Sequence, residues 1–173
     1  MRLRTMGCLL STILVVTPSL ANAAARHAKH AAVPRAERLA CQTGTEDEHA
    51  RIAMDIAKGK VQRFAYYSKW KPKTCSIAAA RGDAYTKWAD NGNVTTVTLP
   101  KGTAVIEEQK RGVYRVTFSH ADRELYCELE GEINGSVTVT HGKHDCGIEG
   151  VMERPASLQQ DDQAKQDDAA AQK

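Results

Sequence analysis

Apolar and polar residues alternate over much of the chain between residues 51 and 118, and this alternation predicts β-strands. The clearest strand runs from 61 to 70, where Phe64, Tyr66 and Trp70 share one face. Further β-prone runs, separated by Gly- and Pro-containing turns, lie at 74–80, 94–99, 103–107 and 113–118. Short strands with a turn about every 8–12 residues are typical of antiparallel sandwiches and small barrels.

We therefore expect a mainly all-β fold, a small antiparallel β-sandwich or barrel of about 7–8 strands that is stabilised by disulfides. One short N-terminal helix is the alternative for residues 46–57. A capping box at Thr45–Glu48 favours the helix, whereas the alternation of Ile52, Met54 and Ile56 favours a strand from about 51 to 57. We predict the strand.

The Asn134-Gly135 pair predicts a hairpin, because it stands between two β-prone runs. A two-residue loop would place apolar residues opposite polar ones. A three-residue loop, 133–135, places Leu129 opposite Val139 on the core side instead. We predict this second register, in which three carboxylates lie together on the solvent side: Glu128, Glu130 and Glu132.

Residues 1–23 have the pattern of a cleavable secretory signal. Arg2 and Arg4 precede an apolar stretch from 8 to 16, and Ala21-Asn22-Ala23 predicts cleavage after Ala23. We therefore expect a periplasmic or secreted protein. The apolar stretch is too short to span a bilayer, so we expect no stable membrane insertion.

The rest of the chain divides into three parts. Residues 24–38 are rich in Ala and basic side chains and predict a flexible leader, and residues 157–173 predict a disordered polar tail. A single β-rich domain is expected between them, at 39–156. Basic and acidic residues are equal in number in that domain, so the formal net charge of +3 comes from outside it. A neutral domain argues against nucleic acid as a partner.

Four of the five cysteines follow the predicted signal, and an even number in an exported chain predicts two disulfides. The hairpin register places Cys127 in mid-strand, where a partner must come from another core strand such as that of Cys75. Cys41 and Cys146 both lie near the borders of the domain. We predict Cys75–Cys127 with Cys41–Cys146, and the local pairing Cys41–Cys75 with Cys127–Cys146 is the alternative.

Two short segments carry residue types that are used in catalysis or metal binding. His141, His144 and Cys146 could supply three zinc ligands, but a disulfide cysteine is the better interpretation in an exported chain. Ser119-His120-Ala121-Asp122 contains the residue types of a catalytic triad without a nucleophile elbow. We therefore expect no metal and no cofactor.

A basic stretch is the candidate partner surface. Six basic residues and no acid lie between 58 and 73, and within them Arg63, Tyr67 and Lys69 share one strand face. Four acids and no base lie between 124 and 132. Two ordinary solvated faces, or an intramolecular match between the two stretches, would also explain this pattern.

The function predicted from these patterns is an exported, non-catalytic binding module that acts on a protein partner. An inhibitor, an immunity-type protein or an envelope accessory protein would fit. The alternative is a small secreted hydrolase or metal-binding protein that uses the region of His120 or of His141 and His144.

Overall fold

The structure is a computed structural model that describes residues 36–171. The predicted signal peptide, its cleavage position after Ala23 and leader residues 24–35 lie outside these residues. Ten strands and two helices make up the described part, and the strands form two antiparallel sheets, which confirms the mainly all-β class. The region predicted as either helix or strand is a strand.

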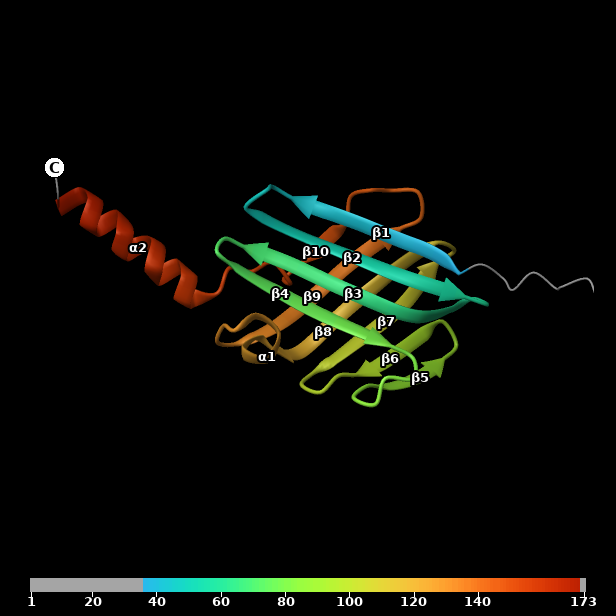
Figure 1. Ribbon diagram of the computed structural model, residues 1–173. Coiled ribbons are helices and arrows are strands. Elements are labelled where there is room, and N and C mark those ends of the chain that lie inside the picture. The colour runs from blue at the N-terminus through green and yellow to red at the C-terminus, as the bar shows by residue number, and fades with distance from the viewer. Residues whose placement is uncertain (1–35, 172–173) are drawn as a thin grey trace, which may run out of the picture. The chain divides into compact units, whose positions relative to one another are not determined.

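The first sheet, here called sheet A, is a four-stranded meander in which each strand pairs with the next along the chain. Its strands are β1 (Glu37–Gly44), β2 (Glu48–Ala57), β3 (Lys60–Trp70) and β4 (Lys73–Ala80). Figure 1 shows sheet A in front of the second sheet, with its strands crossing those behind at an oblique angle.

The second sheet, sheet B, has the strand order β10-β9-β8-β7-β6-β5. Its strands are β5 (Lys87–Asn91), β6 (Val94–Thr98), β7 (Thr103–Lys110), β8 (Val113–Asp122), β9 (Glu132–Thr140) and β10 (Gly147–Glu149). The count of strands exceeds the prediction because β1, β5 and β10 were not expected. β1 begins at Glu37, inside the predicted leader, since Leu39 and Cys41 are buried and alternate with exposed residues.

Aromatic side chains from both sheets form the centre of the core. The ring centroid of Phe118 in β8 lies 5.0 Å from that of Tyr66 and 6.2 Å from that of Phe64, both in β3. These three side chains are almost fully buried. The inward face of 61–70 predicted from the sequence is therefore the surface on which sheet B packs.

The predicted hairpin at Asn134-Gly135 is wrong, because both residues lie inside strand β9. Val139 pairs with Tyr114 of β8, not with Leu129. The Asn-Gly pair serves a bulge: the register between β8 and β9 shifts between Phe118 and Ala121, and the Asn134 side chain accepts a hydrogen bond from the backbone of His120 at 2.8 Å.

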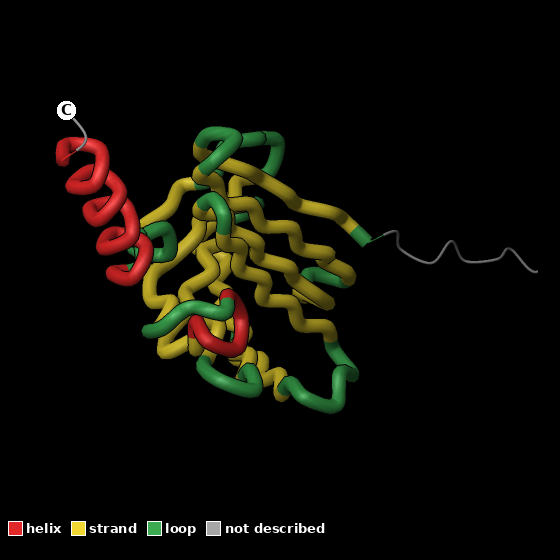
Figure 2. Tube along the Cα trace, turned by 60° about the vertical axis from the view of Figure 1, so that its left-hand side comes forward, coloured by secondary structure: helices red, strands yellow, loops and turns green. Residues whose placement is uncertain are grey.

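The chain reverses instead through the short helix α1 (Arg123–Cys127), which Figure 2 shows in the connection between two strands. The Asp122 side chain accepts hydrogen bonds from two backbone amides of the first turn, and Glu128 ends the helix in the left-handed conformation. The alternating glutamates favoured a strand here, but the capping bonds of Asp122 stabilise a helix instead. Glu128 and Glu130 therefore lie in a loop rather than on a strand face.

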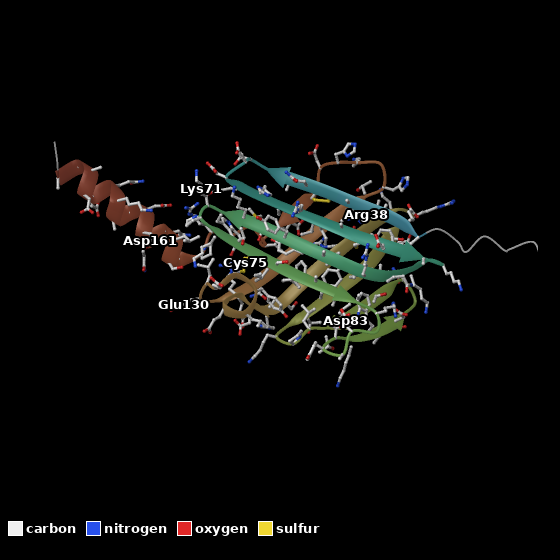
Figure 3. The ribbon with its side chains drawn as sticks, viewed as in Figure 1. Arg38, Lys71, Cys75, Asp83, Glu130 and Asp161 are labelled. Carbon is white, nitrogen blue, oxygen red and sulfur yellow. A yellow bond between two sulfur atoms is a disulfide. The ribbon has the colours of Figure 1, made fainter. Side chains whose placement is uncertain are left out.

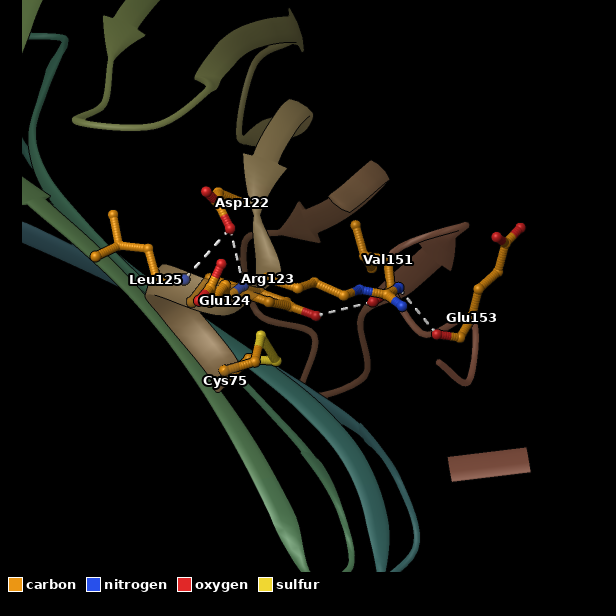
Figure 4. Close-up of a disulfide and its surroundings, with 9 residues drawn as sticks. Cys75, Asp122, Arg123, Glu124, Leu125, Val151 and Glu153 are labelled. Atoms are coloured by element: carbon orange, nitrogen blue, oxygen red, sulfur yellow. Dashed lines mark hydrogen bonds between the residues drawn. A yellow bond between two sulfur atoms is a disulfide. The ribbon is translucent and has the colours of Figure 1, made fainter. Parts of the chain in front are cut away.

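Two disulfides join sheet A to the connections between strands of sheet B, and their pairing is the one that the sequence favoured. Cys41 of β1 is bonded to Cys146, and Cys75 of β4 to Cys127 of α1. Figure 3 labels Cys75 on sheet A, and Figure 4 shows its bond to the helix. The reason given for Cys127 was wrong, because this residue lies in a helix rather than in a strand.

Side chains from α1 and from sheet A hold the segment that follows β10. The buried guanidinium of Arg123 donates a hydrogen bond to the backbone oxygen of Glu153 at 3.0 Å (Figure 4), and burial lowers the pKa of Arg123. The hydroxyl of Tyr66 donates to the backbone oxygen of Val151 at 3.3 Å, and burial raises the pKa of Tyr66 to about 12.

The tail differs from the predicted disorder, because residues 156–171 form helix α2 (Ala156–Ala171). This segment lacks Pro and Gly and is rich in Ala and Gln, which are good helix formers. Leu158 is buried at its start, and Arg154 forms ion pairs with Glu48 of β2 and Asp162 of α2. Residues 172–173 lie outside the described part.

Candidate functional site

The outer face of sheet A carries a row of alanines that crosses all four strands. Ala40 pairs with Ala53, Ala53 with Ala65, and Ala65 with Ala78, so the four residues lie directly beside one another. Their neighbours along each strand point into the core, so the four methyl groups face away from it. Because these side chains are short, they form a low floor between longer side chains on either side.

One wall of this floor is built around an Arg and a Tyr. Arg51 of β2 pairs with Tyr67 of β3, two residues along each strand from the alanines. The guanidinium carbon of Arg51 lies 4.5 Å from the centroid of the Tyr67 ring, a cation–π contact. The ring of His49 lies 5.7 Å from the same centroid. Arg51 and His49 therefore both lie close to the Tyr67 ring.

The opposite wall consists of Arg38, Asp55 and Arg63, which are neighbours across β1, β2 and β3. Arg63 forms an ion pair with Asp55. Within the described residues, neither Arg38 nor Arg51 has a carboxylate within ion-pair distance. We call the alanine floor and its two walls the sheet A channel.

The channel contains two adjoining hollows, with volumes of about 360 Å³ and about 590 Å³. Arg38, Ala53 and Ala65 line both of them. Asp83 lines the smaller hollow, and Figure 3 shows Arg38 and Asp83 toward the same end of the sheet A strands. The channel is therefore an open depression of the surface.

Positive charge predominates around the channel. Four cationic side chains lie on the outer face of sheet A, namely Arg38, Arg51, Arg63 and Lys69, and Asp55 is the only carboxylate among the strand residues of that face in the described chain. Lys69 donates a hydrogen bond to the backbone oxygen of Glu46 at 3.0 Å, which leaves its charge uncompensated.

All three residues predicted as a partner surface lie on this face. Arg63, Tyr67 and Lys69 are on the outer side of β3. Sequence reasoning missed Arg38, which it assigned to the leader, and Arg51, whose side of the 51–57 strand it did not consider. The four alanines also gave a signal, because they recur at intervals of twelve or thirteen residues, the repeat length of the meander.

The remaining part of the basic stretch is largely paired within the molecule. Lys60 binds Asp90 at 3.1 Å, Lys71 lies 3.5 Å from Asp47, and Lys73 lies 3.8 Å from Glu128. The last pair joins the basic stretch to the acidic one, as the intramolecular alternative proposed. Among the described residues, the uncompensated positive charge on the outer face of sheet A thus lies with Arg38, Arg51 and Lys69.

His120 forms a surface dyad with Glu132. Its Nδ1 lies 2.8 Å from the Glu132 carboxylate, which also accepts a hydrogen bond from Asn134 at 3.1 Å. The hydrogen bond from Asn134, followed by that from His120, lowers the pKa of Glu132. Among residues 36–171, no hydroxyl or thiol lies within hydrogen-bond distance of the His120 ring, so a nucleophile and a base are not brought together there.

The three residues that were considered as possible zinc ligands are not brought together. The Cys146 sulfur is bonded to Cys41, His141 lies 3.2 Å from Glu37, and the backbone oxygen of His144 accepts a hydrogen bond from Gln42 at 2.7 Å. Within the described part of the chain, no three His, Cys, Asp or Glu side chains form a group that could hold a metal ion.

Comparison with known proteins gives no match to a family model, to a curated protein or to a solved structure. Neither helix in residues 36–171 is long and apolar enough to cross a membrane. The arrangement of the described residues is therefore the basis for a functional proposal.

Proposed function

We propose that this protein is an exported, non-catalytic binding module that recognises a protein partner through the sheet A channel. An inhibitor, an immunity-type protein or an envelope accessory protein acts in this way. The observation that carries the proposal is the stacked pair of Arg51 and Tyr67 on an open sheet face.

The composition of the channel supports a protein partner. Tyr and Arg are enriched in protein interfaces and frequently supply most of the binding energy. Here they border a floor of methyl groups that lines two hollows. The walls offer charged hydrogen-bond donors, and the floor offers apolar surface.

The frame around the channel supports binding without a large rearrangement. The floor crosses four hydrogen-bonded strands, and two disulfides fasten sheet A to the rest of the described chain. A surface that is already ordered loses little conformational entropy on association, and this raises affinity. The same disulfides are typical of an oxidising compartment, and with the predicted signal they support a periplasmic or secreted location.

The alternative, a small secreted hydrolase or metal-binding protein, has one observation in its favour. The His120–Glu132 dyad has the geometry of an oriented imidazole. It lacks a neighbouring nucleophile among the described residues, and Cys146 is used in a disulfide. The binding module is therefore the better supported proposal.

Capture with matched variants of the chain tests the proposal. Immobilised wild-type protein, Ala65→Arg and Ala89→Arg are each exposed to the exported protein fraction of the source cells. Ala65 lies on the channel floor, and Ala89 is an exposed strand alanine of sheet B. Any captured protein is then purified and its affinity for each variant is measured.

The proposal predicts a purified partner whose binding falls at least tenfold with Ala65→Arg and less than twofold with Ala89→Arg. A large side chain on the floor would occupy the space that the partner needs, whereas the same side chain on sheet B would not. Equal affinity for both variants would reject the channel as the binding surface.

A further inference from the structure

The chemistry of the channel also indicates what kind of segment it accepts. We infer that the sheet A channel binds an extended, acidic polypeptide segment, whose carboxylates pair with Arg51 and Arg38 across the alanine floor. This inference rests on the proposed function and adds the chemical class of the partner.

The charge of the channel is the first reason. Arg38 and Arg51 carry full positive charge and have no carboxylate within ion-pair distance among the described residues, whereas Arg63 is paired with Asp55. A guanidinium donates two parallel hydrogen bonds to a carboxylate, and such charge-assisted bonds are stronger than neutral ones. An acidic segment would provide the acceptors that these two side chains lack.

The contact between Arg51 and Tyr67 is the second reason. The guanidinium carbon of Arg51 lies over the Tyr67 ring, 4.5 Å from its centroid. Stacking limits the rotamers of a long side chain and reduces the entropy lost when it binds a carboxylate. Arg51 is thus prepared for an anionic ligand.

The dimensions of the floor favour an extended chain. Neighbouring strands lie about 4.8 Å apart, so four strands give a floor of about 14 Å, equal to roughly four residues of extended polypeptide. The two walls are four residues apart along each strand, from Arg51 to Asp55 on β2 and from Arg63 to Tyr67 on β3. This separation is about 13 Å. This width takes one chain with its side chains, and the methyl floor can contact short apolar side chains between the acidic ones.

The aromatic content argues against a sugar or a nucleic-acid base as the ligand. These rings bind by stacking on an exposed aromatic face. Tyr67 is the aromatic residue of the channel walls, and Arg51 and His49 flank its ring. An acidic glycan could still use the charges, so it is included in the test.

Titration of the oxidised, 15N-labelled full-length protein tests the inference by NMR. The probes are a ten-residue peptide of alternating Asp and Ala, the same peptide with Asn for Asp, and an oligogalacturonate as an acidic glycan. The variant is Arg51→Gln, and the control is Arg111→Gln, an exposed cation in the turn between β7 and β8. Light scattering monitors the molecular mass throughout.

The acidic peptide is expected to shift the backbone amide signals of Ala40, Ala53, Ala65 and Ala78 with a Kd in the millimolar range or tighter. Arg51→Gln should raise this Kd at least fivefold, Arg111→Gln should change it less than twofold, and the Asn peptide should cause no comparable shifts. Binding should weaken as salt rises from about 0.05 M to 0.3 M, because exposed charges are screened.

Three results would overturn the inference. These are shifts outside the channel, an oligogalacturonate that binds there as tightly as the acidic peptide, or a doubled mass that shows a second copy in the channel. If the acidic peptide does not bind while a captured partner still depends on Ala65, the acidic chemistry is rejected and the proposed function stands. If no partner depends on Ala65, the proposed function fails as well.

Discussion

Arg51 and Tyr67 lie side by side on β2 and β3, with the guanidinium carbon 4.5 Å above the ring. The contact places a fixed positive charge at the border of an apolar floor. Both side chains project from the centres of long strands, so their positions are set by the sheet rather than by a mobile loop. This relationship makes the outer face of sheet A a better candidate for recognition than the loops around His120 or His141.

Removing the Cys41–Cys146 disulfide should destabilise the protein strongly. The bond closes a loop with a sequence separation of 105 residues, and the loss of such a loop costs about 4–5 kcal/mol on the chain-entropy model. The double variant Cys41→Ala/Cys146→Ala should therefore unfold at a much lower urea concentration than the wild type under oxidising conditions. A cost below about 1 kcal/mol would contradict the expected role of this bond.

Gly135→Ala should be far more destabilising than Gly92→Ala. A Cβ at Gly135 would lie 2.2 Å from the backbone oxygen of Glu149, and its φ of +134° is strained for any other residue. We expect a cost of at least about 3 kcal/mol. Gly92 has a φ of +60° with open space around it, so its cost should be about 1–2 kcal/mol. Equal costs in urea titrations would show that β10 does not pack against Gly135.

Asp90 should make stability depend on pH in the acid range. Its carboxylate accepts hydrogen bonds from Arg81 at 2.5 Å, Thr95 at 2.9 Å and Lys60 at 3.1 Å. These bonds, with that from Arg81 first, hold the pKa of Asp90 well below its ordinary value. These bonds therefore stabilise the folded state fully above the pKa that Asp90 has in the unfolded chain, about 4. The stabilisation is lost as pH falls toward the lower pKa that Asp90 has in the folded protein.

Asp90→Asn should accordingly lower the urea midpoint at pH 7, and its difference from the wild type should narrow as pH falls from about 4 toward 2. Asp161→Asn is the control, because Asp161 is exposed on α2 without a hydrogen-bond partner among the described residues. If the urea midpoints of Asp90→Asn and the wild type differ by the same amount over this pH range, Asp90 is not the source of the pH dependence.

Leu158→Ala should show whether the start of α2 packs on the domain. Leu158 is 6% exposed, and truncation of a buried leucine costs about 2–5 kcal/mol. Gln160→Ala, at an exposed position of the same helix, should be nearly neutral. If both variants melt at the wild-type temperature, the tail is dispensable for stability, as its polar sequence first suggested.

The strands of the core could be predicted from the sequence because alternation is a local property. The inward residues of β3 and β8 follow it, and so do the boundaries of most strands. Asn134-Gly135 was misassigned because its role depends on a distant residue, His120, whose backbone binds the Asn134 side chain. Local patterns cannot report a bulge that two separate strands create together.

The channel could be predicted only in part for a similar reason. Arg63, Tyr67 and Lys69 stand close together in the sequence, so their shared face was visible. Arg38 and Arg51 join them only through the register of three strands. The spacing of the four alanines follows from this register. It can be interpreted only when the four strands are known to form one meander.

Site-specific photocrosslinking would test the central claim most directly. A photoreactive amino acid is placed at Ala65 on the channel floor or at Ala89 on sheet B, and each protein is exported and irradiated in the source cells. We predict a crosslinked protein partner from position 65 and none from position 89. Absence of any crosslink from position 65, or the same partner from both positions, would contradict recognition through the sheet A channel.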